Sequence, residues 1–534
     1  YSLDQPELNL TYGAKNKWEI NASTNDRASA GYFGRINYDY KGIYLLELNG
    51  RYDGSSRFPA GDKWAFFPSG SIGYRFSQEA YWDKLRETVS NGKLRFSYGE
   101  IGNENVGSSW PYIATIGTIS ASYVGWLNGS NTKVNEFDLP EWVSSSLTWE
   151  RIKTIDIGLD LGLLNDMVTV GFDWYQRTTN DMIAPGKALP PSVGASTPTT
   201  NSGSLRTRGW ELTINWRKQF TNDLGLYANF SIGDSKSVVT KWDNDQNIGH
   251  PLSTAYAYAG QVWGDIWGFE TDRYFTEADF TGKNADGSWI YAPGVADQTG
   301  IQTQTFVYGP GDIKFKDLDG SGVIDGGKGT VDDHGDLKVI GNCLPRYEYS
   351  FHIGGTYKGF DLDLFFLGVG KRDMWTQSSF VFPEMREADL AIYANQTSYN
   401  IYEPEKGIVN ISESNAFPCL YPGNEYAGNV TGLAGEGGCH NYYPQTKYLV
   451  DMSYLRLKNV TLGYTLPVEL TKKAFVQKLR FYVSCNNLFL LHKGSGDLPI
   501  DPEMNAGQGA LGYGTWGRTY PTTKSWSFGL QVTF

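Results

Sequence analysis

The sequence contains no stretch that approaches the roughly 18 uninterrupted apolar residues of a membrane-spanning helix, which excludes helical membrane spans. Positive charge is also in short supply. The 46 Lys and Arg stand against 58 Asp and Glu, and the net charge of −12 excludes nucleic acid as a partner, because phosphate binding requires a basic face. The only cysteines are Cys343, Cys419, Cys439 and Cys485. Cys419 and Cys439 lie close enough in the sequence to pair in an oxidising compartment, and free thiols are an equally open alternative.

Residues that mark catalytic sites are few. The sequence has 5 His, and none of them falls in an HExxH motif or in a Cys/His metal-binding spacing. The Gly-x-Ser-x-Gly pattern of a nucleophile elbow does not occur where a strand would turn into a helix. We therefore expect no enzymatic activity.

Glycine and aromatic residues are abundant, with 63 Gly, 35 Tyr, 27 Phe and 17 Trp. The clearest pattern lies in residues 525–534, where the even positions from Trp526 to Phe534 are large and apolar and the odd positions are small or polar. Successive side chains of a strand point to opposite faces, so this pattern predicts a strand with one apolar and one polar face. About ten residues with interfacial aromatics are typical of a strand in a transmembrane barrel.

The same alternation recurs along the chain and predicts about 13 strands. They fall at residues 31–40, 44–52, 64–76, 92–100, 147–163, 168–174, 210–216, 224–232, 347–353, 362–366, 454–467, 478–491 and 525–534. Charged residues such as Asp173, Arg217 and Asp363 lie on the second face, so the two faces cannot both belong to a dry core. Short and long connections also alternate, as they do in outer-membrane barrels. The sequence therefore predicts an all-β fold, a transmembrane antiparallel β-barrel.

We expect long extracellular loops at about 101–146, 239–344 and 372–453, with residues 1–28 as a loop or the end of an upstream strand and 29–534 as the barrel. A closed bacterial barrel has an even number of strands, so at least one more strand should come from elsewhere. The chain opens in a polar stretch without a signal peptide, and we expect a mature or truncated piece of a longer chain. The final strand should pair with 478–491, with its apolar face towards lipid and Ser527, Gly529 and Gln531 towards the lumen.

The sharpest local motif is DLDGSGVID at residues 317–325, which matches a calcium loop at positions 1, 3, 5, 7 and 9 with Gly322 at the turn. The expected ligands are the side chains of Asp317, Asp319, Ser321 and Asp325 and the carbonyl of Val323. Position 12 is Lys328, so Asp332, Asp333 or Asp336 would supply the last carboxylate, and we assign it to Asp333. The motif predicts a structural Ca²⁺ in an extracellular loop. Mg²⁺ and an acidic turn without metal are the alternatives.

Tryptophans in the predicted loops form a second candidate site. They are Trp126, Trp142, Trp263, Trp267, Trp289 and Trp375. Flat apolar rings beside Asn and Asp are a common way to hold sugar rings, so these residues predict a carbohydrate or another amphipathic ligand. Packing within the loops is the alternative and the more common fate of any single one. Tryptophans on strands, such as Trp174 and Trp526, are expected at the lipid interface.

Further motifs carry a family resemblance. They are GRINY at 34–38 with YDGSSRF at 52–58, LRFSYG at 94–99 with GN at 102–103, WE at 149–150, GLD at 158–160, RGWEL at 208–212, GDIKFKD at 311–317 and YLRLKNVTLGY at 454–464. Together they resemble the C-terminal barrel portion of SusC/RagA-type TonB-dependent transporters of Bacteroidetes outer membranes. The resemblance implies a barrel of about 22 strands, whose N-terminal plug and TonB box have no counterpart in this chain. It also implies a SusD-like surface lipoprotein as a lid, and import driven by TonB, ExbB and ExbD.

From this resemblance we expect a protein of the cell outer membrane that actively imports oligosaccharides. Import of oligopeptides by the same kind of barrel is the first alternative, because the two would differ only in loop and lumen residues. A passive porin or a surface adhesin is the alternative from another class, and it would lack the plug and the TonB box. Outer-membrane lipid is the remaining expected partner.

Overall fold

The computed structural model describes residues 26–106, 110–119, 136–140, 142–144, 147–186, 190–193, 197–242, 248–249, 256–285, 287–302, 306–375, 381–382, 394–420, 440–503 and 522–534. Trp126 and Cys439 lie outside these residues. Among the described segments, no helix combines the length and the apolar character needed to cross a membrane.

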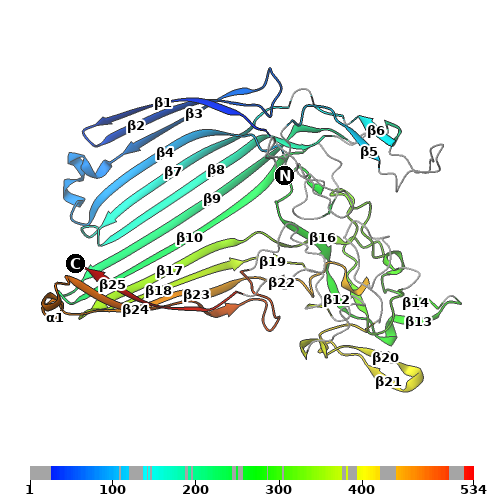
Figure 1. Ribbon diagram of the computed structural model, residues 1–534. Helices are drawn as coiled ribbons and strands as arrows, with labels where there is room; N and C mark the ends of the chain where they lie inside the picture. The colour runs from blue at the N-terminus through cyan, green and yellow to red at the C-terminus, as the bar shows by residue number, and fades with distance from the viewer. Residues whose placement is uncertain are drawn as a thin grey trace, which may run out of the picture.

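A single antiparallel sheet of 13 strands organises the molecule, and its spatial order follows the sequence order (Figure 1). The strands are β1 (Ser29–Tyr40), β2 (Tyr44–Ser55), β3 (Trp64–Tyr74), β4 (Val89–Asn103), β7 (Glu150–Leu163), β8 (Val168–Pro185), β9 (Thr199–Gln219), β10 (Leu224–Lys241), β17 (Arg346–Tyr357), β18 (Phe360–Lys371), β23 (Tyr454–Thr465), β24 (Lys478–Lys493) and β25 (Ser525–Thr533). Each predicted strand overlaps one of these, so the predicted all-β fold is confirmed. β8 and β9 are much longer than the alternation indicated.

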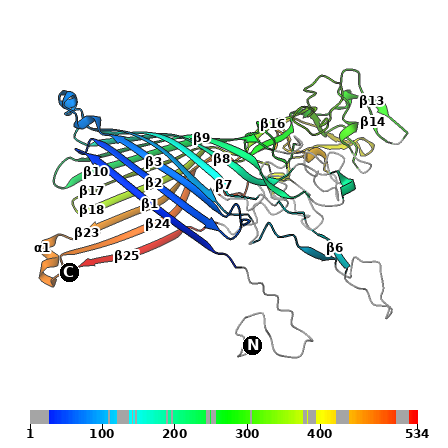
Figure 2. The same ribbon diagram turned by 90° about the horizontal axis from the view of Figure 1, so that it is seen from above.

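The connections differ strongly between the two ends of the sheet. At one end, β7 and β8 are joined by residues 164–167 and β17 and β18 by residues 358–359, and the left-handed backbone of Lys358 and Gly359 closes the tighter turn. Residues 41–43 and 220–223 form two more short turns at this end, and the remaining two connections hold short helices: η1 (Phe76–Gln78), η2 (Ala80–Leu85), α1 (Val468–Thr471) and η11 (Lys472–Ala474). At the opposite end, the chain makes long excursions of 104–149, 242–345 and 372–453. Figures 1 and 2 show these excursions gathered at one end of the curved wall.

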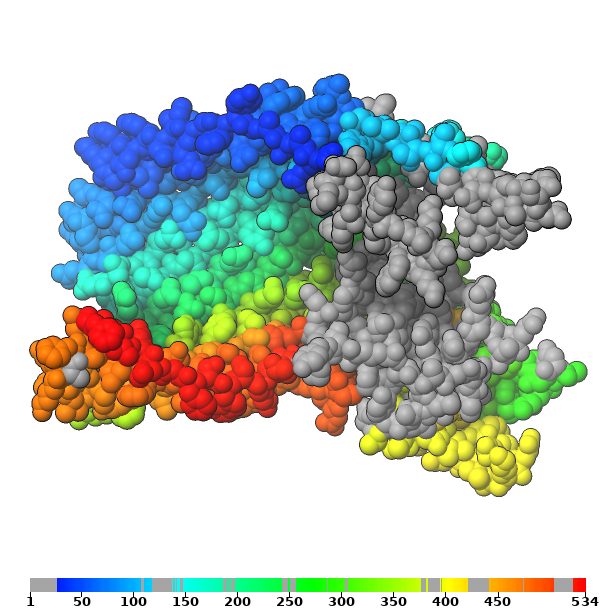
Figure 3. All heavy atoms as spheres, in the orientation of Figure 1, coloured from blue at the N-terminus to red at the C-terminus, as the bar shows by residue number. Residues whose placement is uncertain are grey.

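The alternation of side chains gives the sheet an apolar face and a polar face. On the apolar face, Ile36, Phe96 and Phe528 are all exposed, and Phe528 reaches 80% exposure. β25 pairs with β24 from Lys478 opposite Thr533 to Asn486 opposite Ser525, as predicted. β1 and β25 are the two edge strands, and Figure 3 shows them, in blue and red, at opposite margins of the wall.

The long connections contain small strands and helical turns. These are β5 (Ile116–Ile119), β6 (Glu136–Pro140), η3 (Pro191–Val193), β11 (Asp265–Phe269), β12 (Thr271–Tyr274), η5 (Glu277–Asp279), β13 (Phe280–Lys283), β14 (Trp289–Tyr291), η6 (Thr299–Ile301), β15 (Ile313–Phe315), β16 (Leu337–Asn342), β19 (Asp373–Met374), η8 (Ala394–Gln396), β20 (Ile401–Glu403), η9 (Pro404–Lys406), β21 (Ile408–Asn410), η10 (His440–Tyr442) and β22 (Val450–Asp451). β19 pairs with β22, which joins the two ends of one excursion.

The described residues of 242–345, 372–453 and 494–503 pack into one body, which we call the loop cap. Its hydrophobic core combines residues of all three connections, such as Phe315, Trp375 and Ile500. Buried polar groups tie the connections together as well, because the Asn441 side chain donates to Asp312 (2.8 Å) and accepts from the Ile313 N–H (2.8 Å). The main core of the molecule therefore lies in the loop cap, beyond the end of the sheet.

Candidate functional site

The polar face of the sheet is one candidate site, and ion pairs that cross whole strands shape it. Arg95 on β4 reaches over β7 to Asp173 on β8, with Nη2 2.8 Å from Oδ1. On the way, its Nε lies 2.8 Å from Asp160 of β7. The crossing needs Gly158, because a Cβ at that position would lie 2.4 Å from Asp173 Oδ1 and 2.5 Å from Arg95 Cζ. A glycine in the middle strand thus leaves room for a side chain that joins its two neighbours.

The same arrangement recurs on β18, β23 and β24. Arg480 of β24 donates from Nε to Asp361 Oδ1 of β18 at 2.9 Å, and from Nη2 to Oδ2 at 2.5 Å. Gly463 of β23 lies between them, and a Cβ there would come within 2.5 Å of the carboxylate. A bidentate arginine–carboxylate pair fixes both distance and orientation. These crossings therefore link strands that share no backbone hydrogen bonds.

A third crossing lies between the first two. The Tyr227 hydroxyl of β10 donates to Asp363 of β18, and the ring passes over Gly354 of β17. His352 Nε2 lies 2.7 Å from the same carboxylate. The polar face therefore holds a continuous set of charged and hydroxyl groups from β4 to β24.

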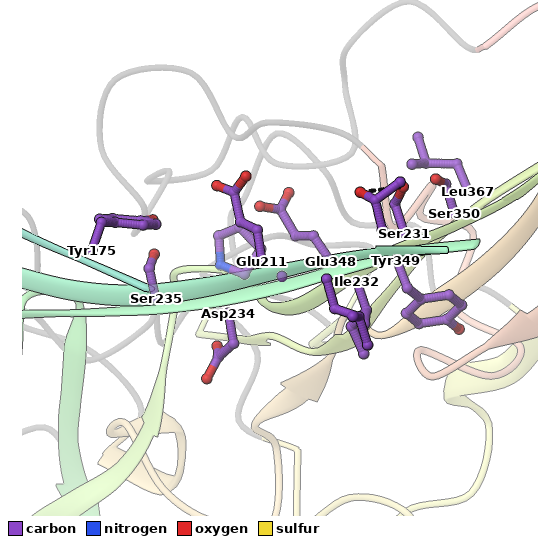
Figure 4. A pocket seen from close by; sticks show the side chains of 14 residues that line it. Tyr175, Glu211, Ser231, Ile232, Asp234, Ser235, Glu348, Tyr349, Ser350 and Leu367 are labelled. Atoms are coloured by element: carbon purple, nitrogen blue, oxygen red, sulfur yellow. Dashed lines mark hydrogen bonds between the residues drawn. The ribbon is translucent and has the colours of Figure 1, made fainter. Parts of the chain in front are cut away.

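A hollow also lies on the same face, and the described residues form no such cross-link across it (Figure 4). It has a volume of about 480 Å³, and its lining includes Glu211 of β9, Ser231 of β10 and Glu348 of β17. Glu211 and Glu348 are each opposite Gly233, so two carboxylates flank a strand position without a side chain. Figure 4 shows both carboxylates on one side of the sheet and Asp234 on the other. Carboxylates and hydroxyls in this arrangement can accept hydrogen bonds from a polar ligand.

One serine–histidine contact occurs at the loop end of β23 and β24. The buried Ser453 Oγ lies 3.2 Å from His492 Nε2. Asp451 accepts a hydrogen bond from the Ser453 backbone N–H at 2.8 Å and does not orient the imidazole. Nucleophilic catalysis requires the base to be oriented by a third group. In the part of the chain that the structure describes, His492 has no such partner, so this contact does not form a triad.

The loop tryptophans fall into different environments. Trp375 (1% exposed) and Trp267 (9%) belong to the core of the loop cap, and Trp289 packs against that core. Trp263 packs against a small cluster at the base of the cap that contains Val239. Trp142 is 55% exposed, and Trp126 lies outside the described residues. The five described rings do not share one exposed site. Trp142 is the one with a ring open to a ligand among those described.

The predicted calcium loop forms a compact turn on the surface of the loop cap. Gly320 and Gly322 have positive φ angles of 76° and 80°, and their N–H groups donate to the two oxygens of Asp317 at 2.7 and 2.8 Å. Asp319 accepts from the Ser321 N–H at 2.8 Å, and the Ser321 hydroxyl lies 2.9 Å from the Val323 carbonyl. Ile324 is fully buried in the core of the cap and anchors the turn.

Asp336, rather than Asp333, completes the acidic cluster. Oxygens of Asp317, Asp319 and Asp336 lie within 4.8 Å of one another. Asp336 accepts from the N–H groups of Leu318 (2.6 Å) and Asp325 (3.0 Å), and burial raises its pKa. Asp333 instead pairs with Lys328 at 2.9 Å. The segment between Asp325 and Asp336 loops out, and Asp336, one of the three candidates from the sequence, lies beside Asp317 and Asp319.

The cluster fits a hard divalent cation. Each carboxylate oxygen in these hydrogen bonds keeps a second lone pair, and oxygen ligands are those that Ca²⁺ and Mg²⁺ prefer. The Ser321 hydroxyl and the Val323 carbonyl lie on the same turn, although they contact each other here. Asp325 has one oxygen engaged by the Gly327 N–H at 2.7 Å.

An ion pair stabilises another part of the loop cap. Arg273 donates to both oxygens of the buried Asp279 at 2.6 and 2.7 Å, and the Thr276 N–H donates to the same carboxylate at 2.8 Å. Burial alone would raise the pKa of Asp279, but these hydrogen bonds outweigh burial and lower the pKa to about 2.

Burial raises the pKa of Cys343 to about 12, so this thiol stays protonated. Cys343, Cys419 and Cys485 are buried free thiols.

Comparison with protein families gives a match over residues 2–303 to the family described as TonB dependent receptor-like, beta-barrel. The chain is 28% identical over 529 residues to TonB-dependent receptor P3 of Formosa agariphila, which covers 96% of this chain and 46% of that protein. It is 26% identical over 506 residues to TonB-dependent receptor SusC of Bacteroides thetaiotaomicron, covering 94% and 43%. The chain spans about half the length of the curated relatives it matches.

Among solved structures, the fold is similar to that of the RagAB peptide transporter. The TM-score is 0.66 at 22% identity, and the match covers 95% of this chain and 48% of that one. At this identity the similarity extends to the fold. It shows a wall of the same architecture as the one built here from β1 to β25.

Proposed function

We infer the function of this chain from the premise that it belongs to the TonB-dependent receptor-like β-barrel family. It is a SusC-type barrel segment of the outer membrane. We propose that the complete protein actively imports oligosaccharides, that TonB, ExbB and ExbD supply the energy, and that a SusD-like surface lipoprotein covers the extracellular end.

The polar face of the sheet is the observation that carries the proposal. Its charged groups are cross-linked through Arg95, Arg480 and Tyr227, which holds the wall of a polar passage rigid. The hollow between Glu211 and Glu348 offers carboxylate and hydroxyl acceptors to a ligand rich in hydroxyl groups. The exposed Trp142 offers a flat ring at the loop end. Stacking and hydrogen bonding together suit a sugar chain.

Import of oligopeptides is the second candidate. Its support is the similar fold of a structure described as a peptide transporter. The acceptors around Glu211 and Glu348 would also bind the N–H groups of a peptide. The two candidates share the barrel and the energy source, and they differ in the ligand bound at the loop end.

We further propose that the acidic cluster of Asp317, Asp319 and Asp336 binds a structural Ca²⁺, with Mg²⁺ as the alternative. Three carboxylates that approach within 4.8 Å repel one another unless a cation lies between them. A cation there would hold the turn that carries Ile324 into the core of the loop cap. Its role would be to order the cap.

Calorimetry on the full-length transporter with its lipoprotein tests the substrate class. A panel of neutral oligosaccharides and a panel of oligopeptides are titrated in parallel. We expect binding to a member of the sugar panel, weaker binding by Trp142→Ala, and unchanged binding by Trp64→Ala, which removes an exposed ring from the apolar face. Binding to peptides and to no sugar would contradict the proposal and support the second candidate.

Uptake into cells tests the energy source. Uptake should stop when TonB is deleted or when a protonophore collapses the proton-motive force. Undiminished uptake in both conditions would indicate a passive porin, and the absence of uptake in every condition would indicate an adhesin.

A further inference from the structure

Basic side chains gather on the apolar face of the sheet, just beyond the end of its apolar band. Figure 4 places Asp234 and Ile232 of β10 on this face and Ser235 on the other, so Lys236, two residues after Asp234, shares it. Lys236 is directly opposite Arg208 of β9, and Arg208 is opposite Gln176 of β8. The Arg208 Nε donates to Gln176 Oε1 at 2.7 Å, which confirms that both side chains lie on one face.

Directly opposite residues on neighbouring strands form a row across the sheet. The next row on this face, two residues closer to the loop cap, adds two more basic residues. Arg206 of β9 is opposite Thr178 of β8, and Thr178 is opposite Lys153 of β7. Neither ladder is shifted between these rows, so the side chains stay on the same face. We call Lys153, Arg206, Arg208 and Lys236 the outer basic patch.

The patch lies directly above a pair of tryptophans. Trp174 and Trp210 are opposite each other on β8 and β9, one row nearer the short turns than Arg208. Below them the face is apolar, with Phe172 and Leu212 paired in the next row. Tryptophan marks the level at which the hydrocarbon layer meets the headgroups. The outer basic patch is therefore at headgroup level on the side of the long loops.

Some residues of the patch face a carboxylate, because Lys236 interacts with Asp265 of β11 and Lys153 with Glu100 of β4. Glu100 of β4 lies 3.4 Å from both Arg151 and Lys153. Asp234 forms a bidentate pair with Arg346. Among the described residues, Arg206 and Arg208 form no ion pair, so they supply the patch's excess of positive charge in a chain whose net charge is −12. At the loop end of β1 to β3 the same face carries stacked rings instead, such as Tyr52 against Trp64 at 5.1 Å.

We propose that the outer basic patch binds the phosphate headgroup of an anionic lipid in the extracellular leaflet of the outer membrane. Arginine matches phosphate oxygens through two parallel N–H donors, and Gln176 holds the Arg208 guanidinium in place. The proposal rests on the outer-membrane location of the barrel and is independent of the imported substrate. A bound lipid would anchor β7 to β10, and β10 leads into the longest excursion.

Native mass spectrometry of the full-length transporter tests the proposal. The protein is placed in nanodiscs of phosphatidylcholine with increasing fractions of phosphatidic acid, and bound phosphatidic acid is counted after release. A basic residue near an anionic lipid surface changes the affinity about fivefold. We expect Arg208→Gln to weaken retention by about fivefold, and the triple variant Arg206→Gln, Arg208→Gln, Lys236→Gln by about a hundredfold.

Arg177→Gln is the matched control, because Arg177 lies on β8 between Gln176 and Thr178 but points to the polar face. It should retain lipid as the unmodified protein does. Equal retention by all variants, or equal loss in the Arg177 variant, would overturn the proposal. Displacement of the lipid by inorganic phosphate alone would show a free-anion site and would overturn the assignment to lipid. If the triple variant fails to insert, Lys236→Gln alone gives the same comparison.

Discussion

Replacing Gly158 by alanine should destabilise the barrel through one specific contact. The new Cβ would lie 2.4 Å from Asp173 Oδ1 and 2.5 Å from Arg95 Cζ, so the two side chains must separate. Hydrogen bonds to charged groups contribute about 1.5–3 kcal/mol, and the low end applies because the Arg95 and Asp173 side chains are 31% and 29% exposed. Alanine also lowers the conformational entropy of the unfolded chain, which stabilises the folded state by about 0.4–1 kcal/mol and offsets part of this loss. We expect a net loss of about 1 kcal/mol.

Urea unfolding of the full-length transporter in detergent, followed by tryptophan fluorescence, measures this change. Gly171→Ala is the control: Gly171 is opposite Asp160 on β7, and a Cβ there would have its nearest neighbour, Asp160 Oδ1, at 3.9 Å. It should be neutral or stabilising. In an Arg95→Ala, Asp173→Ala background, Gly158→Ala should cost nothing, because both obstructing side chains are gone. An equal cost in both backgrounds would refute the steric explanation.

Three further predictions concern the loop cap. Trp375→Ala should cost about 3–5 kcal/mol of cap stability, measured by protection from limited proteolysis, because its side chain is 1% exposed; Trp142→Ala, at 55% exposure, should leave protection unchanged. Added Ca²⁺ should raise the melting temperature of the unmodified protein and of the Asp333→Asn variant but not of the Asp336→Asn variant. An equal rise in all three proteins would exclude the cluster of Asp317, Asp319 and Asp336 as the Ca²⁺ site. The pKa of about 2 for Asp279 lies below the unfolded value of about 3.9, so its contribution is complete above pH 4 and is lost as the pH falls towards 2. Asp279→Asn should flatten that part of the pH profile of protection, and an unchanged profile would contradict the assignment.

The strands of the sheet were predictable because the information that specifies them is local. In β25, five large residues alternate with small or polar ones, and no distant contact is needed to read that period. The short turns follow from the same reasoning, since Lys358 and Gly359 separate two alternating runs. Local periodicity fails where a strand leaves the membrane layer. The loop-side half of β9, from Thr199 to Gly209, has no apolar alternation, and it was missed.

The contacts that define the sites depend on residues distant in the sequence. Arg95 and Asp173 are 78 positions apart, and nothing in either strand shows that Gly158 will lie between them. The sequence signal for such a crossing is a glycine at a polar-face position, flanked by opposite charges on its neighbouring strands. Asp336 was one of three candidates for the last metal ligand, and spacing alone could not show that residues 326–335 loop out.

The shared core of the loop cap limits how its parts can move and evolve. Phe315 comes from one connection, Trp375 from a second and Ile500 from a third, and all three are at least 98% buried. Displacing one connection would expose apolar surface on the other two, at about 25 cal/mol for each Å². The three connections should therefore open and close over the polar face as one unit. To transfer the ligand specificity of this protein to a related transporter, all three connections would have to be grafted together. One connection alone would leave the hydrophobic core of the related transporter's loop cap incomplete.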